Sequence, residues 1–134
     1  MIETSSFFDI HQTETSRISQ VDFNNLDFGR VFSDHMFVMG YENGAWQRGK
    51  IEPYGPFTMS PASMVFHYGQ AIFEGMKAYN TGDGGVSIFR PGKNINRFNL
   101  SARRMCMPEV PEDLFMEALA TLVELDKAWV PTGD

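Results

Sequence analysis

The stretch Ser60–Tyr79, which reads SPASMVFHYGQAIFEGMKAY, decides the fold predicted for this chain. Ser60 can cap a helix, Pro61 suits its first turn, and Gly75 stands where a helix usually ends. The side chains that recur at helical spacing are Met64, Tyr68, Ala71, Ile72 and Gly75. After Gly75 the period changes to two, which is typical of a strand. The stretch therefore predicts a helix from Pro61 to Gly75 that leads directly into a short strand at Met76–Tyr79.

The sequence on both sides of this stretch predicts two β-hairpins. Upstream, the apolar run Met36–Met39 is long enough for a buried strand, and the turn dipeptide Asn43-Gly44 separates it from a returning strand over Ala45–Ile51. Downstream, a glycine-rich turn separates Met76–Tyr79 from the alternating segment Val86–Phe89. Both strand pairs are expected to be antiparallel.

Two further helices are predicted, one from Pro91 with an apolar face through Ile95 and Phe98, and one from about Pro111. Helices and hairpins are segregated, with no repeated strand-helix-strand unit, so the predicted fold class is α+β with a mainly antiparallel sheet. Residues 1–27 show no sustained period and are interpreted as an irregular amino-terminal arm. Residues 28–134 are expected to form one small domain.

The composition indicates an ordinary soluble globular protein. Of 134 residues, 43% are hydrophobic and 21% are charged, and the formal net charge is −6. A net negative charge argues against a nucleic-acid or anionic-membrane surface, because counterion release requires basic residues. With a single cysteine, Cys106, and neither a leader nor a spanning segment recognised, the expected location is the cytoplasm.

Four blocks of the sequence carry a resemblance to a known family. The motifs His67-Tyr68-Gly69 and Phe73–Tyr79 resemble the small domain of fold-type IV pyridoxal-phosphate enzymes. The segments Phe28–Met36, Asn94–Phe98 and Leu125–Pro131 are similar to those of the branched-chain amino acid aminotransferases. The resemblance covers about residues 28 to 131 in family order.

The resemblance implies a parent enzyme that transfers the amino group between leucine, isoleucine or valine and 2-oxoglutarate. Its cofactor would be pyridoxal 5'-phosphate, its partners would be branched-chain amino acids and 2-oxo acids, and it would act as a homodimer. In the family, a second, larger domain supplies the catalytic lysine, which would lie beyond position 134. The chain is thus interpreted as an amino-terminal small domain that is inactive alone and has no catalytic residue of its own.

Arg97 is the candidate cofactor-binding residue. A planar guanidinium can grip a phosphate through two parallel hydrogen bonds, although most helix arginines are simply solvated. The resemblance implies that Arg97 holds the phosphate of the cofactor. It also implies that Tyr68, Phe73 and Phe28 line the substrate pocket, where aromatic walls suit an aliphatic side chain. Lys77 is expected on the polar face of its strand rather than on the cofactor.

Other interpretations are weaker or remain open. Ser33-Asp34-His35 lie too close on an extended segment to converge as a hydrolase triad, and His35 and His67 lack a third metal ligand, so no metal is assigned. A D-amino acid aminotransferase or an aminodeoxychorismate lyase would share the central motifs. From a different class, the chain could be a non-catalytic interaction domain that binds a partner through its apolar face.

Overall fold

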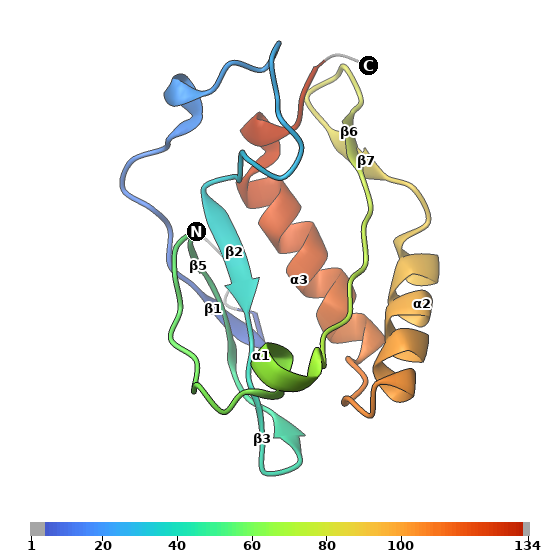
Figure 1. Cartoon of the computed structure of the whole chain (residues 1–134). Helices are drawn as coiled ribbons and strands as arrows, with labels where there is room; N and C mark the ends of the chain where they lie inside the picture. Colours follow the sequence, from blue (N-terminus) through green and yellow to red (C-terminus); the bar gives the residue numbers. More distant parts are fainter. Residues whose placement is uncertain (1–4, 133–134) are drawn as a thin grey trace.

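The computed structural model describes residues 5–132 and shows three α-helices, seven short strands and two 3-10 helices within that range (Figure 1). The strands are β1 (Phe8–Ile10), β2 (His35–Val38), β3 (Tyr41–Glu42), β4 (Ala45–Trp46), β5 (Gly49–Pro53), β6 (Ala78–Asn80) and β7 (Val86–Ile88). The helices are α1 (Met64–Tyr68), α2 (Pro91–Arg104) and α3 (Glu112–Leu125), with 3-10 turns η1 (Ile18–Gln20) and η2 (Lys127–Trp129). The α+β fold class predicted from the sequence is confirmed.

The main sheet has the strand order β1-β5-β2 and packs against α3. β2 and β5 are antiparallel, with Phe37 opposite Ile51, so the hairpin predicted around Asn43-Gly44 is confirmed. Asn43 and Gly44 both have positive φ angles, 52° and 80°, which the tight turn between β3 and β4 requires. The second predicted hairpin is also present, as β6 and β7.

The central core lies between the sheet and α3. It consists of Phe8, Ile51, Leu114 and Ala118, all buried, with the ring of Phe37 packed edge-on against Phe8 at a centroid distance of 5.4 Å. One apolar face of each element is removed from water here. This hydrophobic burial is the main favourable contribution to the folding free energy of so small a domain.

The two long helices begin close to where the sequence predicts. Pro91 occupies the first turn of α2, and Ile95 and Ala102 are buried on its inner face. The side-chain amide of Asn99 exchanges two hydrogen bonds of 2.8 Å with the backbone of Val110, which ties α2 to the segment before α3. None of the helices within residues 5–132 is both long and apolar enough to cross a membrane.

The helix predicted over Pro61–Gly75 is wrong in length. α1 spans only five residues and ends at Gly69, which adopts the left-handed conformation with φ 61°. Beyond Gly69, half-buried and exposed residues alternate as far as Ala78, which is the pattern of an extended segment. The strand is therefore not entered directly from a helix, and β6 begins at Ala78.

The irregular arm predicted over residues 1–27 is wrong for Phe8–Ile10. These residues form β1, which pairs parallel to β5 with Phe8 opposite Gly49, and Phe8 belongs to the core. The pairing is made with a strand some forty positions away, so no local period announces it. The rest of the described arm is mostly loop with the turn η1, and residues 1–4 lie outside the described part of the chain.

Candidate functional site

The extended segment after Gly69 presents alternate side chains to opposite sides. Glu74 points inward to α2, whereas Phe73 is 86% exposed and Lys77 is exposed. Lys77 was expected on the polar face of a strand, but it precedes β6, and its side of the segment also carries Phe73. Gln70 anchors the beginning of the segment by donating a hydrogen bond of 2.8 Å from Nε2 to the carbonyl of Met105. The segment is thus fixed against the two ends of α2 rather than by helical packing.

Glu74 and Arg97 form a two-pronged ion pair. Arg97 Nε donates to Glu74 Oε2 at 2.7 Å, and Nη2 donates to Oε1. Asn94 Nδ2 and the backbone N–H of Gly75 also donate to Oε1, at 3.0 and 3.1 Å. The Glu74 side chain is only 5% exposed, and the Arg97 hydrogen bonds are the main reason that the pKa of Glu74 falls from 4.5 to about 2. Glu74 is therefore ionised at neutral pH and fixes the orientation of the guanidinium.

Arg97 keeps donors for a second anion. Its side chain is 67% exposed, and its Nη1 group makes no hydrogen bond to the described residues. Phe73, Glu74, Gly75, Arg97 and Ser101 line one open pocket, so a serine one helical turn from Arg97 borders the same space. These donors fit a phosphate group. Because Glu74 already balances the charge of Arg97, they would hold that group only weakly without further cations.

The structure brings together some of the predicted site residues. Phe73 lies in the same pocket as Arg97, whereas Tyr68 and Phe28 are not among the residues that line it. Tyr68 is the last residue of α1 and is 77% exposed, and the Phe28 side chain is fully exposed. The structure of this chain therefore does not bring Tyr68 or Phe28 together with Arg97.

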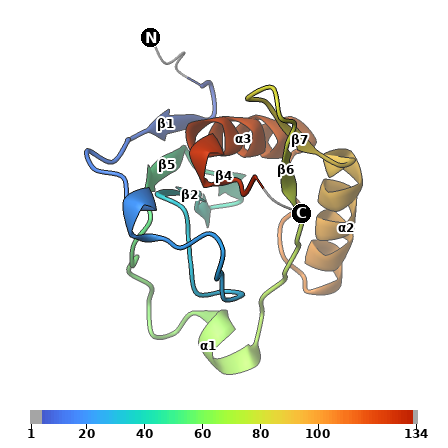
Figure 2. The same cartoon turned by 90° about the horizontal axis from the view of Figure 1, so that it is seen from above.

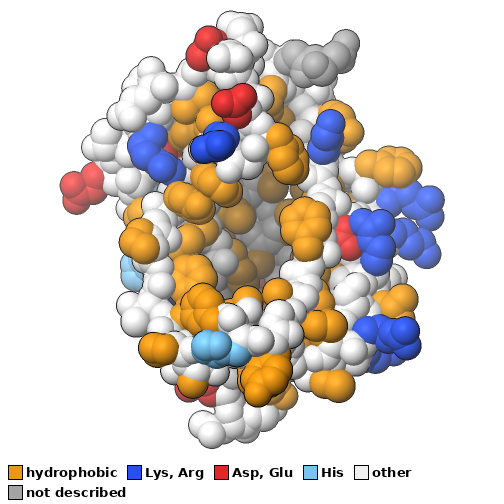
Figure 3. All heavy atoms as spheres, in the orientation of Figure 1, with side chains coloured by type: hydrophobic (Ala, Val, Ile, Leu, Met, Phe, Trp, Pro, Cys, Tyr) orange, Lys and Arg blue, Asp and Glu red, His pale blue; other side chains and the backbone are white. Residues whose placement is uncertain are grey.

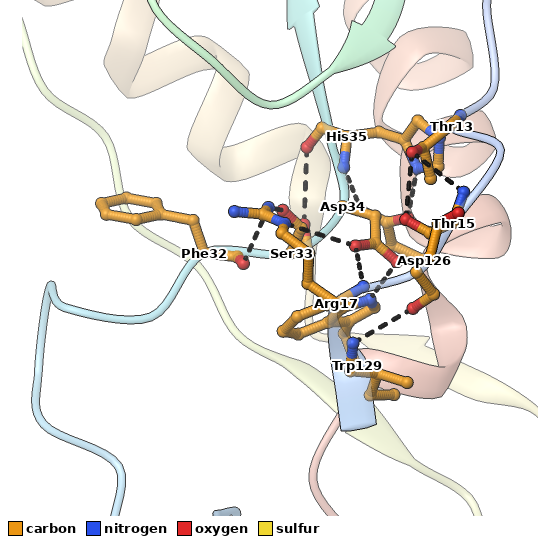
Figure 4. Close-up of polar contacts among 11 residues, drawn as sticks. Thr13, Thr15, Arg17, Phe32, Ser33, Asp34, His35, Asp126 and Trp129 are labelled. Carbon is orange, nitrogen blue, oxygen red and sulfur yellow. Dashed lines mark hydrogen bonds and ion pairs between the residues drawn. The ribbon is translucent and has the colours of Figure 1, made fainter. Parts of the chain in front are cut away.

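A buried polar cluster was not anticipated from the sequence (Figure 4). His35, at the start of β2, donates its backbone N–H to Asp126 Oδ2 at 3.0 Å, and its Nδ1 lies 2.6 Å from Asp126 Oδ1. The backbone N–H of Thr13 donates to His35 Nε2 at 3.0 Å, so Nε2 carries no proton and Nδ1 is the donor. His35 thus links the arm, the sheet and the end of α3.

Asp34 completes this cluster on its other side. Its carboxylate accepts hydrogen bonds from the backbone N–H of Arg17 at 2.9 Å and from Trp129 Nε1 at 3.0 Å. Burial alone would raise the pKa of Asp34. These two hydrogen bonds, a hydrogen bond from the Ser16 side chain and the positive charge of Arg17 together keep that pKa below its usual value. Asp34 does not bond to His35, so the interpretation that Ser33-Asp34-His35 is not a triad is confirmed. The clue in the sequence was two polar or amphipathic residues, Asp126 and Trp129, directly after an apolar helix.

Comparison with known proteins identifies the relatives of the chain. It is 57% identical over 111 residues to branched-chain-amino-acid transaminase 1 of Bacillus subtilis, a match that covers 82% of this chain and 31% of that protein. It is 51% identical over 108 residues to a probable branched-chain-amino-acid aminotransferase of Streptomyces coelicolor, a match that covers 80% of this chain and 30% of that protein. It is 42% identical over 118 residues to the branched-chain-amino-acid aminotransferase of Mycolicibacterium smegmatis, a match that covers 87% of this chain and 32% of that protein. No family model matches the chain.

These similarities, together with the α+β fold, relate the chain to the aminotransferases. More particularly, the chain is related to the branched-chain-amino-acid aminotransferases and corresponds to the amino-terminal part of them, which confirms the resemblance carried by its motifs. The chain spans about a third of the length of these relatives.

Proposed function

We propose that this chain is the small domain of an enzyme that transfers the amino group between leucine, isoleucine or valine and 2-oxoglutarate, with pyridoxal phosphate as cofactor. The observation that carries the proposal is the identity of 57% over 111 residues to a branched-chain-amino-acid transaminase. The cofactor, when bound, supplies the electron sink that stabilises a carbanion at the α-carbon of the substrate.

Arg97 is the proposed phosphate-binding residue. Its free Nη1 edge and the Ser101 hydroxyl provide donors to a phosphate oxygen, and Glu74 holds the guanidinium in place from the opposite edge. A preformed donor pair loses little side-chain freedom on binding, which favours affinity. Glu74 is then a positioning residue, because it acts through Arg97.

Phe73, Tyr68 and Phe28 are the proposed wall of the substrate pocket. All three aromatic side chains are exposed, and Phe73 lies beside Arg97. Aromatic rings of this kind exclude water from an aliphatic substrate side chain, and the Tyr68 hydroxyl can orient a polar group at the edge of such a pocket. The rings would be covered by the rest of the enzyme and by the substrate.

The proposed assembly is a homodimer in the cytoplasm in which residues 28–134 form the small domain. A larger domain would supply the catalytic lysine, so the isolated 134-residue chain is expected to be inactive. A single cysteine and a net charge of −6 are compatible with this assignment.

A chimera tests the proposal. The matching part of the Bacillus subtilis relative is replaced by this chain, and turnover of leucine, isoleucine, valine, D-alanine and aminodeoxychorismate is measured. We expect turnover of the three branched-chain amino acids with 2-oxoglutarate. A folded chimera that acts only on one of the other two substrates, or on none, would overturn the proposal.

Two arginine variants of the chimera test the role of Arg97. Arg97→Ala is expected to raise the pyridoxal phosphate concentration needed for half-maximal activity by about tenfold or more, which corresponds to one charge-assisted hydrogen bond or more. Arg104→Ala removes an exposed arginine from the same helix and is the matched control. Equal cofactor requirements in the two variants would refute the assignment.

A further inference from the structure

Basic side chains are concentrated on α2 and on the residue before it. Five of the 11 lysine and arginine residues of the chain lie within Arg90–Arg104, which contains no acidic residue. Figure 3 shows Lys and Arg side chains gathered on the right of the molecule, where Figures 1 and 2 place α2 at the outer side of the fold. Because the chain as a whole carries a formal charge of −6, this helix differs in charge from the rest of the protein.

Most of these basic side chains share the face of α2 that carries Arg97. Lys93 is four residues before Arg97 and Arg104 is seven residues after it, which are spacings of about one and two helical turns. Arg90, the N-cap residue of α2, is seven residues before Arg97 and extends the same face toward the start of the helix. All three are exposed, and we call Arg90, Lys93 and Arg104 the flanking cations.

The flanking cations have no acidic partner in the described part of the chain. Among residues 5–132, none of the three forms an ion pair or donates a side-chain hydrogen bond, and the guanidinium of Arg90 lies over the ring of Phe89. On a different face of the helix, Arg103 forms an ion pair with Glu109 at 3.4 Å. The flanking cations are therefore available to an anion from outside the chain.

The proposed phosphate site needs such cations. The charge of Arg97 is balanced by Glu74, which is ionised at neutral pH. A phosphate group brings a charge of about −1.5 to −2, so its contact with Arg97 alone would leave a net negative charge beside Glu74. Nearby cations without a partner of their own reduce this unfavourable charge.

We propose that the flanking cations attract phosphorylated ligands to the Arg97 pocket and supply the positive charge that the Glu74–Arg97 pair lacks. This inference deepens the proposed function and rests on it. Arg97 and Ser101 would make the direct contacts, whereas the flanking cations act through their electrostatic field and need no fixed geometry. The site would thus select pyridoxal phosphate over pyridoxal, which lacks the phosphate.

Distance along α2 ranks the three flanking cations. The helix rises about 1.5 Å per residue, so Lys93 lies about 6 Å from Arg97 along the axis, and Arg90 and Arg104 each lie about 10 Å away. The screening length is about 10 Å at 0.1 M salt and about 30 Å at 0.01 M. Lys93 should therefore dominate at the salt concentration of an activity assay, where Arg104 has little effect, and all three should act in dilute salt.

A phosphate titration tests this inference. Inorganic phosphate is added to the 134-residue chain, and the Arg97 side-chain N–H and Ser101 amide signals are followed by NMR. At an ionic strength of about 0.02 M, we expect Lys93→Gln to weaken phosphate binding about threefold, and replacement of all three flanking cations by glutamine to weaken it about tenfold. Lys93→Arg keeps the charge and should preserve the affinity. The differences should vanish at about 0.5 M salt.

Arg103→Gln is the matched control. It removes the same charge from the same helix, but Arg103 is paired with Glu109 and lies on a different face from Arg97. We expect the phosphate affinity of this variant to be close to that of the unsubstituted chain. Equal effects of Lys93→Gln and Arg103→Gln would mean that only net charge matters, which overturns the inference.

Pyridoxal phosphate and pyridoxal separate the role of the phosphate from other effects. Each compound is mixed with the cofactor-free chimera, and binding is followed by absorbance. In dilute salt, Lys93→Gln should slow the association of pyridoxal phosphate about threefold and leave that of pyridoxal unchanged. Equal slowing of both compounds would mean that Lys93 does not act through the phosphate and would overturn the inference.

The remaining outcomes also decide the question. Absence of phosphate binding to the folded chain in dilute salt overturns the inference, and if the chain alone does not fold, the chimera measurements decide. A chimera that does not turn over branched-chain amino acids but binds phosphate in a Lys93-dependent way refutes only the proposed function. An active chimera in which Lys93→Gln and Arg103→Gln behave alike refutes only this inference.

Discussion

Truncation of Asp126 is expected to destabilise the chain strongly. Its carboxylate accepts two hydrogen bonds from His35, one from the backbone N–H and one from Nδ1, and both residues are buried. Asp126→Ala leaves two buried donors without a partner, at about 1–3 kcal/mol each. The free energy of unfolding should fall by about 2–6 kcal/mol, out of the 5–15 kcal/mol typical of a folded domain. Asp126→Asn keeps one acceptor oxygen and should cost about half as much.

Urea unfolding followed by circular dichroism measures these differences. Glu124→Ala is the control, because Glu124 lies in the last turn of α3, two residues before Asp126, and forms an exposed ion pair with Lys127 that is worth less than about 1 kcal/mol. The ¹⁵N chemical shifts of His35 should report a neutral ring with its proton on Nδ1 in the unsubstituted chain. An Asp126→Ala variant as stable as Glu124→Ala would refute the reasoning, and so would a proton on Nε2.

Three further outcomes are expected. The pKa of Glu74 is depressed from 4.5 to about 2 in the folded chain, so its ionised form stabilises the fold above pH 4.5, and this contribution disappears as the pH falls through about 2. Glu74→Gln should therefore make the unfolding free energy less dependent on pH between 4.5 and about 2. An unchanged pH dependence would contradict this assignment. Gly69→Ala should lower the unfolding free energy by about 1 kcal/mol in thermal melts, because Gly69 has a φ of 61° and open space around it. A Cβ at Gly49 would lie 2.9 Å from the ring of Phe37, so Gly49→Ala should cost about 1–3 kcal/mol in urea, whereas Gly40→Ala, with no atom within 4 Å, should be close to neutral; similar costs at both positions would argue against the packing of the sheet.

The parts of the fold that the sequence predicts are those with strong local signals. α2 begins at Pro91 and α3 follows Pro111, because proline suits a first turn and a long apolar stripe sustains the helix. The turn at Asn43-Gly44 is decided by its own backbone preferences. In each case the information lies within a few residues of the structure that it determines.

The parts that the sequence did not predict depend on distant partners. The segment after Gly69 has helical spacing at Ala71 and Ile72, but contacts from Glu74 to α2 stabilise an extended conformation instead. The buried position of Phe8 depends on a parallel pairing with β5. The partner of Arg97 could not be predicted either, because Glu74 reaches it only when the segment is extended.

The ion pair between Glu74 and Arg97 connects this local structure to the proposed chemistry. The Glu74 carboxylate is nearly buried and the Arg97 guanidinium is mostly exposed. Glu74 therefore fixes the guanidinium from the protein interior, and the rest of the guanidinium remains accessible to solvent. A longer helix through Gly75 would have left Arg97 without this anchor, free to sample many rotamers. The short α1 and the extended segment that follows it are therefore the features that orient this helix arginine for the proposed phosphate contact.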